Sequence, residues 1–483
     1  MATFLILCVL VAGEVQAPSV YSANEELRGL LLEAGNNSPA IKARHQACLA
    51  ALERVPQATA LDDPMFTYGQ FLQSDVSRFK LMASQKFPWF GTLRTRGKKA
   101  AAEADAALAR LYGERNRVFA EVKRAYAEYA FLAASLRVTE EQTELLAFME
   151  DVVRSKLALG LAGEDELLRV AIEKTRLEDR RAQLTQMRPV VVGSLNEALG
   201  CDVTAERPWP QEAALPPPLP PVPAVLAQVR AANPDLSVFD HLAESRQEQV
   251  QLARKKGYPD FTVGLEYMSL SKPRQIRPDR PYPATLNAAN RVLNTAMGAT
   301  PFSLANAAID TYALATAAEP MAYSDGGEDN VMVSLSLNVP IWRKRVRAGV
   351  QEARLLEDAT HHEKRRTTLA LEAAAQRAMF GVQDAARRHR LFQDALLPQA
   401  QQTYESLQTA YAAGLLGSSF LDVLDSVQTL LEFQLEQVHA VRDWRLAAAE
   451  LERLMGGPWI PEAGRAAPAD TSSQSTAAAQ GAD

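Results

Sequence analysis

The chain has 483 residues, of which 47% are hydrophobic and 23% charged, and its net charge is −6. These values are typical of a folded protein, and the acidic balance argues against a nucleic-acid-binding protein. Three scattered cysteines exclude a disulfide framework and a Cys-x-x-Cys zinc site. No apolar run reaches the roughly 20 residues that a transmembrane helix needs, so a membrane crossing would have to use strands.

The chain begins with an almost wholly apolar stretch, residues 3–13, and small residues follow at the position where a signal peptidase would cut. Residues 1–17 therefore resemble a secretory signal peptide. No Lys or Arg precedes the apolar stretch, which departs from that pattern and leaves a buried strand or helix as the alternative.

Short sequence motifs recur along the chain and indicate an internal repeat. PMFTYG at residues 64–69 recurs as PDFTVG at 259–264, and LNEALG at 195–200 recurs as LERLMG at 451–456. The spacing between the copies changes mainly once, which indicates a single insertion in the second copy. We therefore predict a first repeat at 18–207, a Pro-rich linker at 208–223, a second repeat at 224–458 with an insertion at 272–330, and a disordered tail at 459–483.

Each repeat is predicted to contain a short helical region, two strands, a long helix, a turn and a returning helix. The short helical regions are expected at 22–56 and 222–256, with a capping box from Ser22 to Glu25 and helix restarts at Pro39 and Pro234. The long helices are expected from about 95 to 159, roughly 100 Å of helix, and from about 344 to 413, where Pro398 should produce a kink.

The strand candidates near 65–71, 79–83, 261–267 and 333–339 largely alternate apolar and polar residues. This alternation is typical of a barrel strand in a membrane, although a half-buried sheet in a soluble protein has the same pattern. Four strands cannot close a barrel, and open strand edges are not tolerated in lipid. Three copies would supply twelve strands, and their long helices could enclose a water-filled bore. The predicted fold class is mainly α with a small β portion, assembled as a homotrimer.

Several segments resemble the TolC-type outer-membrane efflux ducts over residues 22–458. They are Asn233-Pro234, the strand entry at 258–261, the exit at 339–342, and the segment from Tyr411 to Asp425. The resemblance implies a trimer with a twelve-stranded outer-membrane barrel and a periplasmic α-helical tunnel. The segment Phe87 to Gly91 looks most like the heavy-metal-efflux branch of this family.

The resemblance implies roles for residues around the two glycine-containing turns. Asp422 and Asp425 would contribute to a ring of carboxylates at the periplasmic mouth, although two solvated helix charges would have the same spacing. Tyr411 matches a family tyrosine that helps to hold the duct closed, but residues 415–419 contain no basic partner for it. A closed state would then depend on packing by Leu415, Leu416 and Phe420. The turns would be the tips that meet a periplasmic adaptor, through Gly160, Leu161, Gly163, Gly414, Leu415 and Gly417.

We therefore expect a non-enzymatic exit duct in the outer membrane, with no catalytic residues, cofactor or metal site. It would conduct small molecules or metal ions delivered by a periplasmic adaptor and an inner-membrane pump, either proton-driven or of the ABC type. The expected contacts are other copies of the chain, these partners and outer-membrane lipid, with no nucleic acid. The alternatives are a type I protein-secretion duct and a structural coiled-coil protein without transport activity.

Overall fold

The computed structural model describes residues 25–72, 77–160, 162–210, 219–270, 329–413 and 419–457. These residues form two compact units, and each unit takes segments from both predicted repeats. The helical unit comprises residues up to Ala58, Thr95–Gln251 and the chain from Gly349, and the sheet unit comprises Thr59–Arg94 and Leu252–Ala348. The predicted signal peptide, Ser22, Leu161, residues 414–417 and the tail at 459–483 lie outside the described residues.

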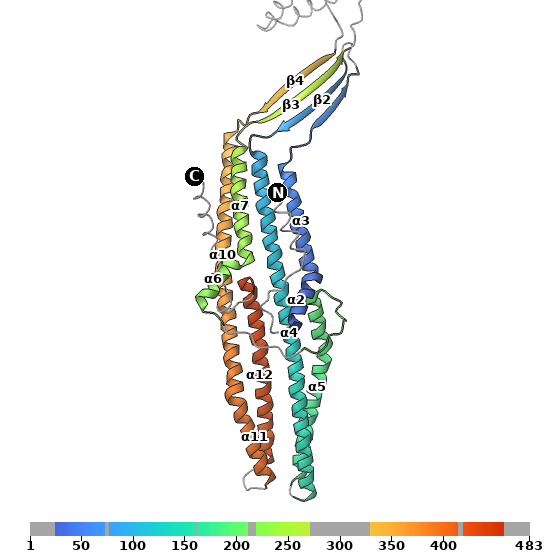
Figure 1. Ribbon diagram of the computed structural model, residues 1–483, viewed down its shortest axis with the longest axis vertical. Coiled ribbons are helices and arrows are strands. Elements are labelled where there is room, and N and C mark those ends of the chain that lie inside the picture. The colour runs from blue at the N-terminus through green and yellow to red at the C-terminus, as the bar shows by residue number, and fades with distance from the viewer. Residues whose placement is uncertain are drawn as a thin grey trace, which may run out of the picture. The chain divides into compact units, whose positions relative to one another are not determined.

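The first half of the chain builds a long helical hairpin. Helix α4, Thr92–Ala158, runs for 67 residues, and α5, Glu164–Leu199, returns along it (Figure 1). Two shorter helices, α2 at Glu25–Asn37 and α3 at Pro39–Thr59, precede the strands. The apolar face of α2 packs with α4 and α5 in one core, which contains Leu31, Val122, Tyr129, Leu195 and Leu199.

The second half builds a related arrangement with an interruption. Helices α6, Val222–Ala232, and α7, Pro234–Lys255, precede a strand, and α10, Arg343–Leu391, follows the last strand. A π-helical turn, η2 at Phe392–Leu396, separates α10 from α11, Leu397–Ala412. The break falls where the sequence places Pro398, because a proline inside a helix removes a backbone hydrogen bond and can kink or break the helix. Helix α12, Phe420–Met455, then returns beside α11 (Figure 1).

In both halves a glycine that ends the returning helix packs closely against the junction between the two short helices. Gly456 ends α12 in the left-handed conformation, with φ of +80°, and a Cβ there would lie 2.2 Å from the carbonyl oxygen of Ala232. The buried amide of Asn233 donates to the carbonyl of Leu454 at 2.7 Å. Gly200, with φ of +73°, ends α5 in the same way, and a Cβ there would lie 2.9 Å from the Cα of Ser38. The predicted helix restarts at Pro39 and Pro234 are therefore confirmed.

The sheet unit holds four antiparallel strands in the order β1-β2-β3-β4. They are β1 at Met65–Gln70, β2 at Ser77–Phe87, β3 at Asp260–Leu270 and β4 at Asn330–Asn338. The central pairing of β2 with β3 joins the two halves of the chain in one sheet. This pairing explains why the compact units do not follow the predicted repeats.

The two faces of the sheet differ in chemistry, as the alternation predicts. Apolar side chains on one face are exposed, including Phe66 at 78%, Leu265 at 52% and Val333 at 73%. On the other face, Lys80 forms an ion pair with Glu266 at 2.7 Å, and Lys86 forms one with Asp260 at 3.2 Å. The sheet therefore presents a large apolar surface to its surroundings.

Two predicted boundaries differ from the structure. Helix α6 begins at Val222, so the last two residues of the expected linker are helical, since a proline at position 223 fits the first turn. Asn330 pairs with Met268 in the sheet, so the insertion expected at 272–330 ends before Asn330. None of the helices in the described ranges is long and apolar enough to cross a membrane.

Candidate functional site

The turn between α4 and α5 forms one tip of the helical unit. Gly160 adopts φ of +72°, a left-handed conformation that favours glycine, and Gly163 is the extended N-cap of α5. Three acidic residues, Glu164, Asp165 and Glu166, occupy the first turn of α5. Carboxylates are stabilised at that position by the helix dipole.

The second tip lies between α11 and α12. Ser419 is the N-cap of α12, and its hydroxyl accepts a hydrogen bond from the amide of Leu421 at 3.1 Å. Asp422 completes this capping box by accepting from the amide of Ser419 at 3.1 Å. The predicted turn residues Gly414, Leu415, Leu416 and Gly417 lie outside the described residues, as does Leu161 in the first turn.

Tyr411 links the two tips. Its hydroxyl donates a hydrogen bond of 2.6 Å to the Glu166 carboxylate, and its ring lies 3.7 Å from the ammonium of Lys156. Lys156 also donates to the Tyr411 carbonyl. Burial, together with the Glu166 carboxylate, raises the pKa of the Tyr411 hydroxyl. A phenol that stays protonated remains a donor, so this polar contact can hold α11 against α4 and α5.

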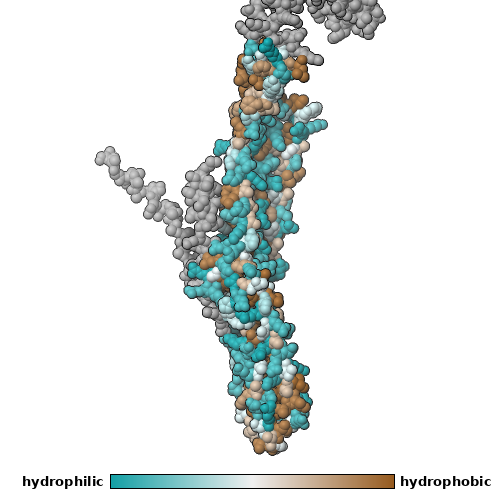
Figure 2. Space-filling model, turned by 90° about the vertical axis from the view of Figure 1, so that its right-hand side faces the viewer, coloured by the Kyte–Doolittle hydropathy of each residue, from teal (hydrophilic) through white to brown (hydrophobic). Residues whose placement is uncertain are grey.

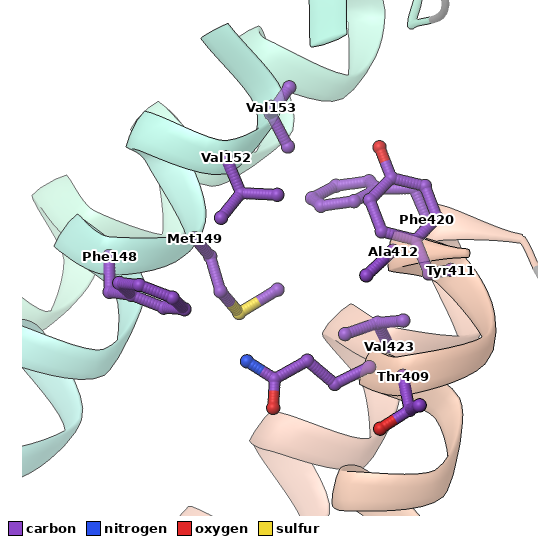
Figure 3. A pocket seen from close by; sticks show the side chains of 10 residues that line it. Phe148, Met149, Val152, Val153, Thr409, Tyr411, Ala412, Phe420 and Val423 are labelled. Atoms are coloured by element: carbon purple, nitrogen blue, oxygen red, sulfur yellow. The ribbon is translucent and has the colours of Figure 1, made fainter. Parts of the chain in front are cut away.

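An apolar core lies beside this polar contact. Phe420 is 3% exposed, and its ring centroid is 5.7 Å from that of Tyr411. Together with Met149, Val153 and Val423 it belongs to a core to which α4, α5, α11 and α12 all contribute. A cavity of about 250 Å³ remains here. Figure 3 shows its lining, with side chains from α4 on one side and from α11 and α12 on the other. The ends of the four helices therefore pack through an apolar core that leaves a cavity unfilled.

The surface near the tips combines exposed carboxylates with exposed apolar groups. Asp422 and Asp425 are both exposed on α12, and the neighbouring Leu421 is 49% exposed. Phe148 on α4, Leu159 in the turn after it and Leu168 on α5 are each more than half exposed. Figure 2 shows apolar side chains gathered at this end of the helical unit. Such a surface is typical of a site that meets a partner.

The structure brings together two of the residues expected from the sequence, Tyr411 and Phe420, while Asp422 caps α12. It adds two that the sequence analysis missed, Glu166 and Lys156. The family resemblance places the basic partner of Tyr411 within residues 415–419, whereas Lys156 comes from the other hairpin. Lys156 and Glu166 both flank the first turn, and that position could have suggested them. Within the described ranges, no group of three or more His, Cys, Asp and Glu residues is placed to hold a metal ion.

Comparison with solved structures supports the fold over nearly the whole chain. The outer membrane protein VceC from Vibrio cholerae superposes with a TM-score of 0.65 at 16% identity, over 90% of this chain and 97% of that one. CusC superposes with a TM-score of 0.67 at 15% identity, over 92% and 96% of the two chains. The open state of the MtrE outer membrane channel from Neisseria gonorrhoeae gives 0.64 at 13% identity, over 89% of each chain.

Sequence comparison finds a family match over the second half of the chain. No curated protein matches the chain. The model of the outer membrane efflux protein family matches residues 225–457, which span the second half of the chain from α6 to the C-terminal end of α12. That segment includes Tyr411, Phe420, Asp422 and Asp425. By this match the second half of the chain is similar to the outer membrane efflux protein family.

Proposed function

We propose that the chain is the outer-membrane exit duct of a tripartite efflux system and works as a homotrimer. It conducts small molecules or metal ions passively and has no enzymatic activity. The family match and the fold support this proposal. The observation that carries it furthest is the sheet, which exposes apolar side chains on one face and holds ion pairs on the other.

The chemistry of the sheet fits a lipid environment. An exposed face that includes Phe66, Leu265 and Val333 is unfavourable in water and favourable against hydrocarbon. Strands β1 and β4 are the edges of the sheet within one chain, and their free backbone groups need partners in lipid. Edge-to-edge pairing of three copies provides those partners. The face that carries Lys80 and Glu266 then lines the bore.

The tips supply the gate and the partner contacts. The contact of Tyr411 with Glu166 and Lys156 holds the periplasmic end closed, and Phe420 adds packing beside it. Three copies of Asp422 and Asp425 form a carboxylate ring that attracts cations. The exposed apolar residues around Gly160 and Gly163 meet a periplasmic adaptor, and an inner-membrane pump supplies the energy.

Planar-bilayer recording of the purified protein tests the proposal. We expect discrete ion-conducting channels with a preference for cations. The double variant Asp422→Asn/Asp425→Asn should weaken that preference, while the side-chain amide introduced at position 422 keeps an acceptor oxygen for the cap. Asp179→Asn makes the same kind of change on an exposed part of α5 away from α12 and is the control. Folded protein that inserts without conducting would refute the duct, whereas unchanged selectivity in the double variant would refute only the carboxylate ring.

A further inference from the structure

A second cavity lies in the helical unit between α4 and α7, distinct from the tip. The two helices are held side by side by the Ser245 hydroxyl, which donates to Glu103 at 3.2 Å, and by the ion pair of Lys98 with Glu248 at 3.7 Å. The cavity has a volume of about 340 Å³. Its lining includes Asp105, Tyr112, Arg115, Ser237, His241 and Gly456.

One end of this groove contains an arginine without an acidic partner. Among the described residues, Arg115 makes no ion pair or hydrogen bond, and its Nε is buried without an acceptor. Its guanidinium lies 5.1 Å from the centroid of the Tyr112 ring. Burial lowers the pKa of Arg115, with no nearby carboxylate to oppose the effect. By contrast, Arg117 and Arg124 on the same helix pair with glutamates. A half-buried cation without a counterion is unfavourable and favours an anionic ligand.

The opposite end of the groove is acidic. Asp105 precedes Arg115 by ten residues, about 15 Å along the helix axis. The Arg115 guanidinium lies 5.1 Å from the centroid of the Tyr112 ring and 5.9 Å from that of the Phe119 ring. No described residue forms an ion pair or hydrogen bond with Asp105. Burial raises the pKa of its carboxyl, His241 lowers it and Glu244 raises it. The Nδ1 of His241 is buried without a hydrogen-bond partner, with Glu244 3.6 Å away, beyond hydrogen-bonding distance.

The groove has apolar side chains on its α4 side and a mixed lining elsewhere, with Ser237 and Pro234 from α7. Leu108, Ala109 and the Tyr112 ring line it on the α4 side, between the acidic end and the basic end. The close approach of Gly456 to Ala232 leaves no room for a side chain at the Arg115 end. An unpaired acid and an unpaired base therefore line a single cavity, with Leu108, Ala109 and Tyr112 between them along α4.

We propose that this groove binds a small zwitterion of the ω-amino acid class. The ligand's carboxylate pairs with Arg115, its ammonium group pairs with Asp105, and its methylene chain lies along Leu108 and Tyr112. A simple anion would neutralise only the Arg115 end and would leave Asp105 unpaired. The site goes beyond the proposed duct function, and its test needs no transport activity.

Calorimetric titration of the purified full chain tests the site, with 6-aminohexanoate as the probe. We expect it to bind at least about tenfold more tightly than hexanoate or hexylamine, because each of these retains only one charged contact. Glycine, whose two charges lie close together, should not bind. Arg115→Gln and Asp105→Asn should each weaken binding of 6-aminohexanoate by at least about tenfold. Arg110→Gln, at an exposed position of the same helix that does not line the cavity, should leave it unchanged.

The ligand series on the unmodified protein decides the question even if a variant fails to fold. Equal affinity for hexanoate and 6-aminohexanoate would overturn the proposal in favour of a simple anion site. Absence of binding by 6-aminohexanoate at millimolar concentration would overturn it altogether. If Asp105→Asn folds and binds the zwitterion as well as the unmodified chain does, the assignment of the ammonium contact is wrong.

Discussion

Removing the Tyr411 hydroxyl is the sharpest test of the tip contact. Tyr411→Phe removes the hydrogen bond of 2.6 Å to Glu166 and keeps the ring that faces Lys156 and Phe420. A hydrogen bond to a charged group contributes about 1.5–3 kcal/mol. Glu166 is only partly buried and can be rehydrated, so the lower end of that range applies, about 1.5 kcal/mol. The closed contact should therefore open about tenfold more often.

Amide hydrogen exchange in the last turns of α11 and α4 measures this local opening. Exchange there should accelerate about tenfold in Tyr411→Phe. The double variant Tyr411→Phe/Glu166→Ala should resemble the single variants, because both changes remove the same bond. Tyr404→Phe, seven residues earlier on α11, changes a tyrosine that does not contact Glu166 and is the control. Unchanged exchange in Tyr411→Phe, or additive effects in the double variant, would refute the reasoning.

Three further predictions concern stability, measured as thermal unfolding midpoints. The pKa of Tyr411 is raised above its ordinary value of 10, so the stability that its hydroxyl contributes is present below pH 10 and is lost as pH rises further. The unfolding midpoints of the unmodified chain and of Tyr411→Phe should therefore converge above pH 10. Gly456→Ala should lose at least about 2 kcal/mol, because it is strained and crowded, while Gly457→Ala, with open space at its Cβ, should lose much less; equal effects would contradict the close approach. Hydrogen bonds from Arg207 lower the pKa of Glu33 below 4.5, so that contribution is present above pH 4.5 and is lost as pH falls through the lowered pKa. Glu33→Gln should cost about 1 kcal/mol at pH 7 and less at acid pH, and a constant difference would refute this account.

Local signals in the sequence predicted the elements well. Helices begin at Pro39 and Pro234, because a proline has no amide proton to lose in the first turn of a helix. The strands lie where apolar and polar residues alternate, and the helix break lies next to Pro398. Each of these signals acts over a few residues. They could therefore be read without knowledge of which segments meet in space.

Contacts between the two halves were not predictable in this way. Tyr411 meets Glu166 across 245 positions of the chain, and Arg115 and His241 line one cavity from two different helices. These contacts depend on the register in which long helices pack, and a shift of one turn would replace every partner. No local pattern encodes that register. Lys156 was missed for the same reason.

The central pairing of the sheet also has a consequence for biosynthesis. Strand β2 pairs with β3 from the other half of the chain. The partner of Lys80 in this pairing is Met268, which is synthesised roughly 190 residues later. Until then the backbone groups of β2 that pair with β3 lack their hydrogen-bond partners, and the β1–β2 hairpin exposes apolar side chains such as Phe66. Nascent chains in this state are prone to aggregate. Folding of this protein should therefore be slow and sensitive to crowding. It should benefit from a chaperone that shields the β1–β2 hairpin until β3 and β4 have been synthesised.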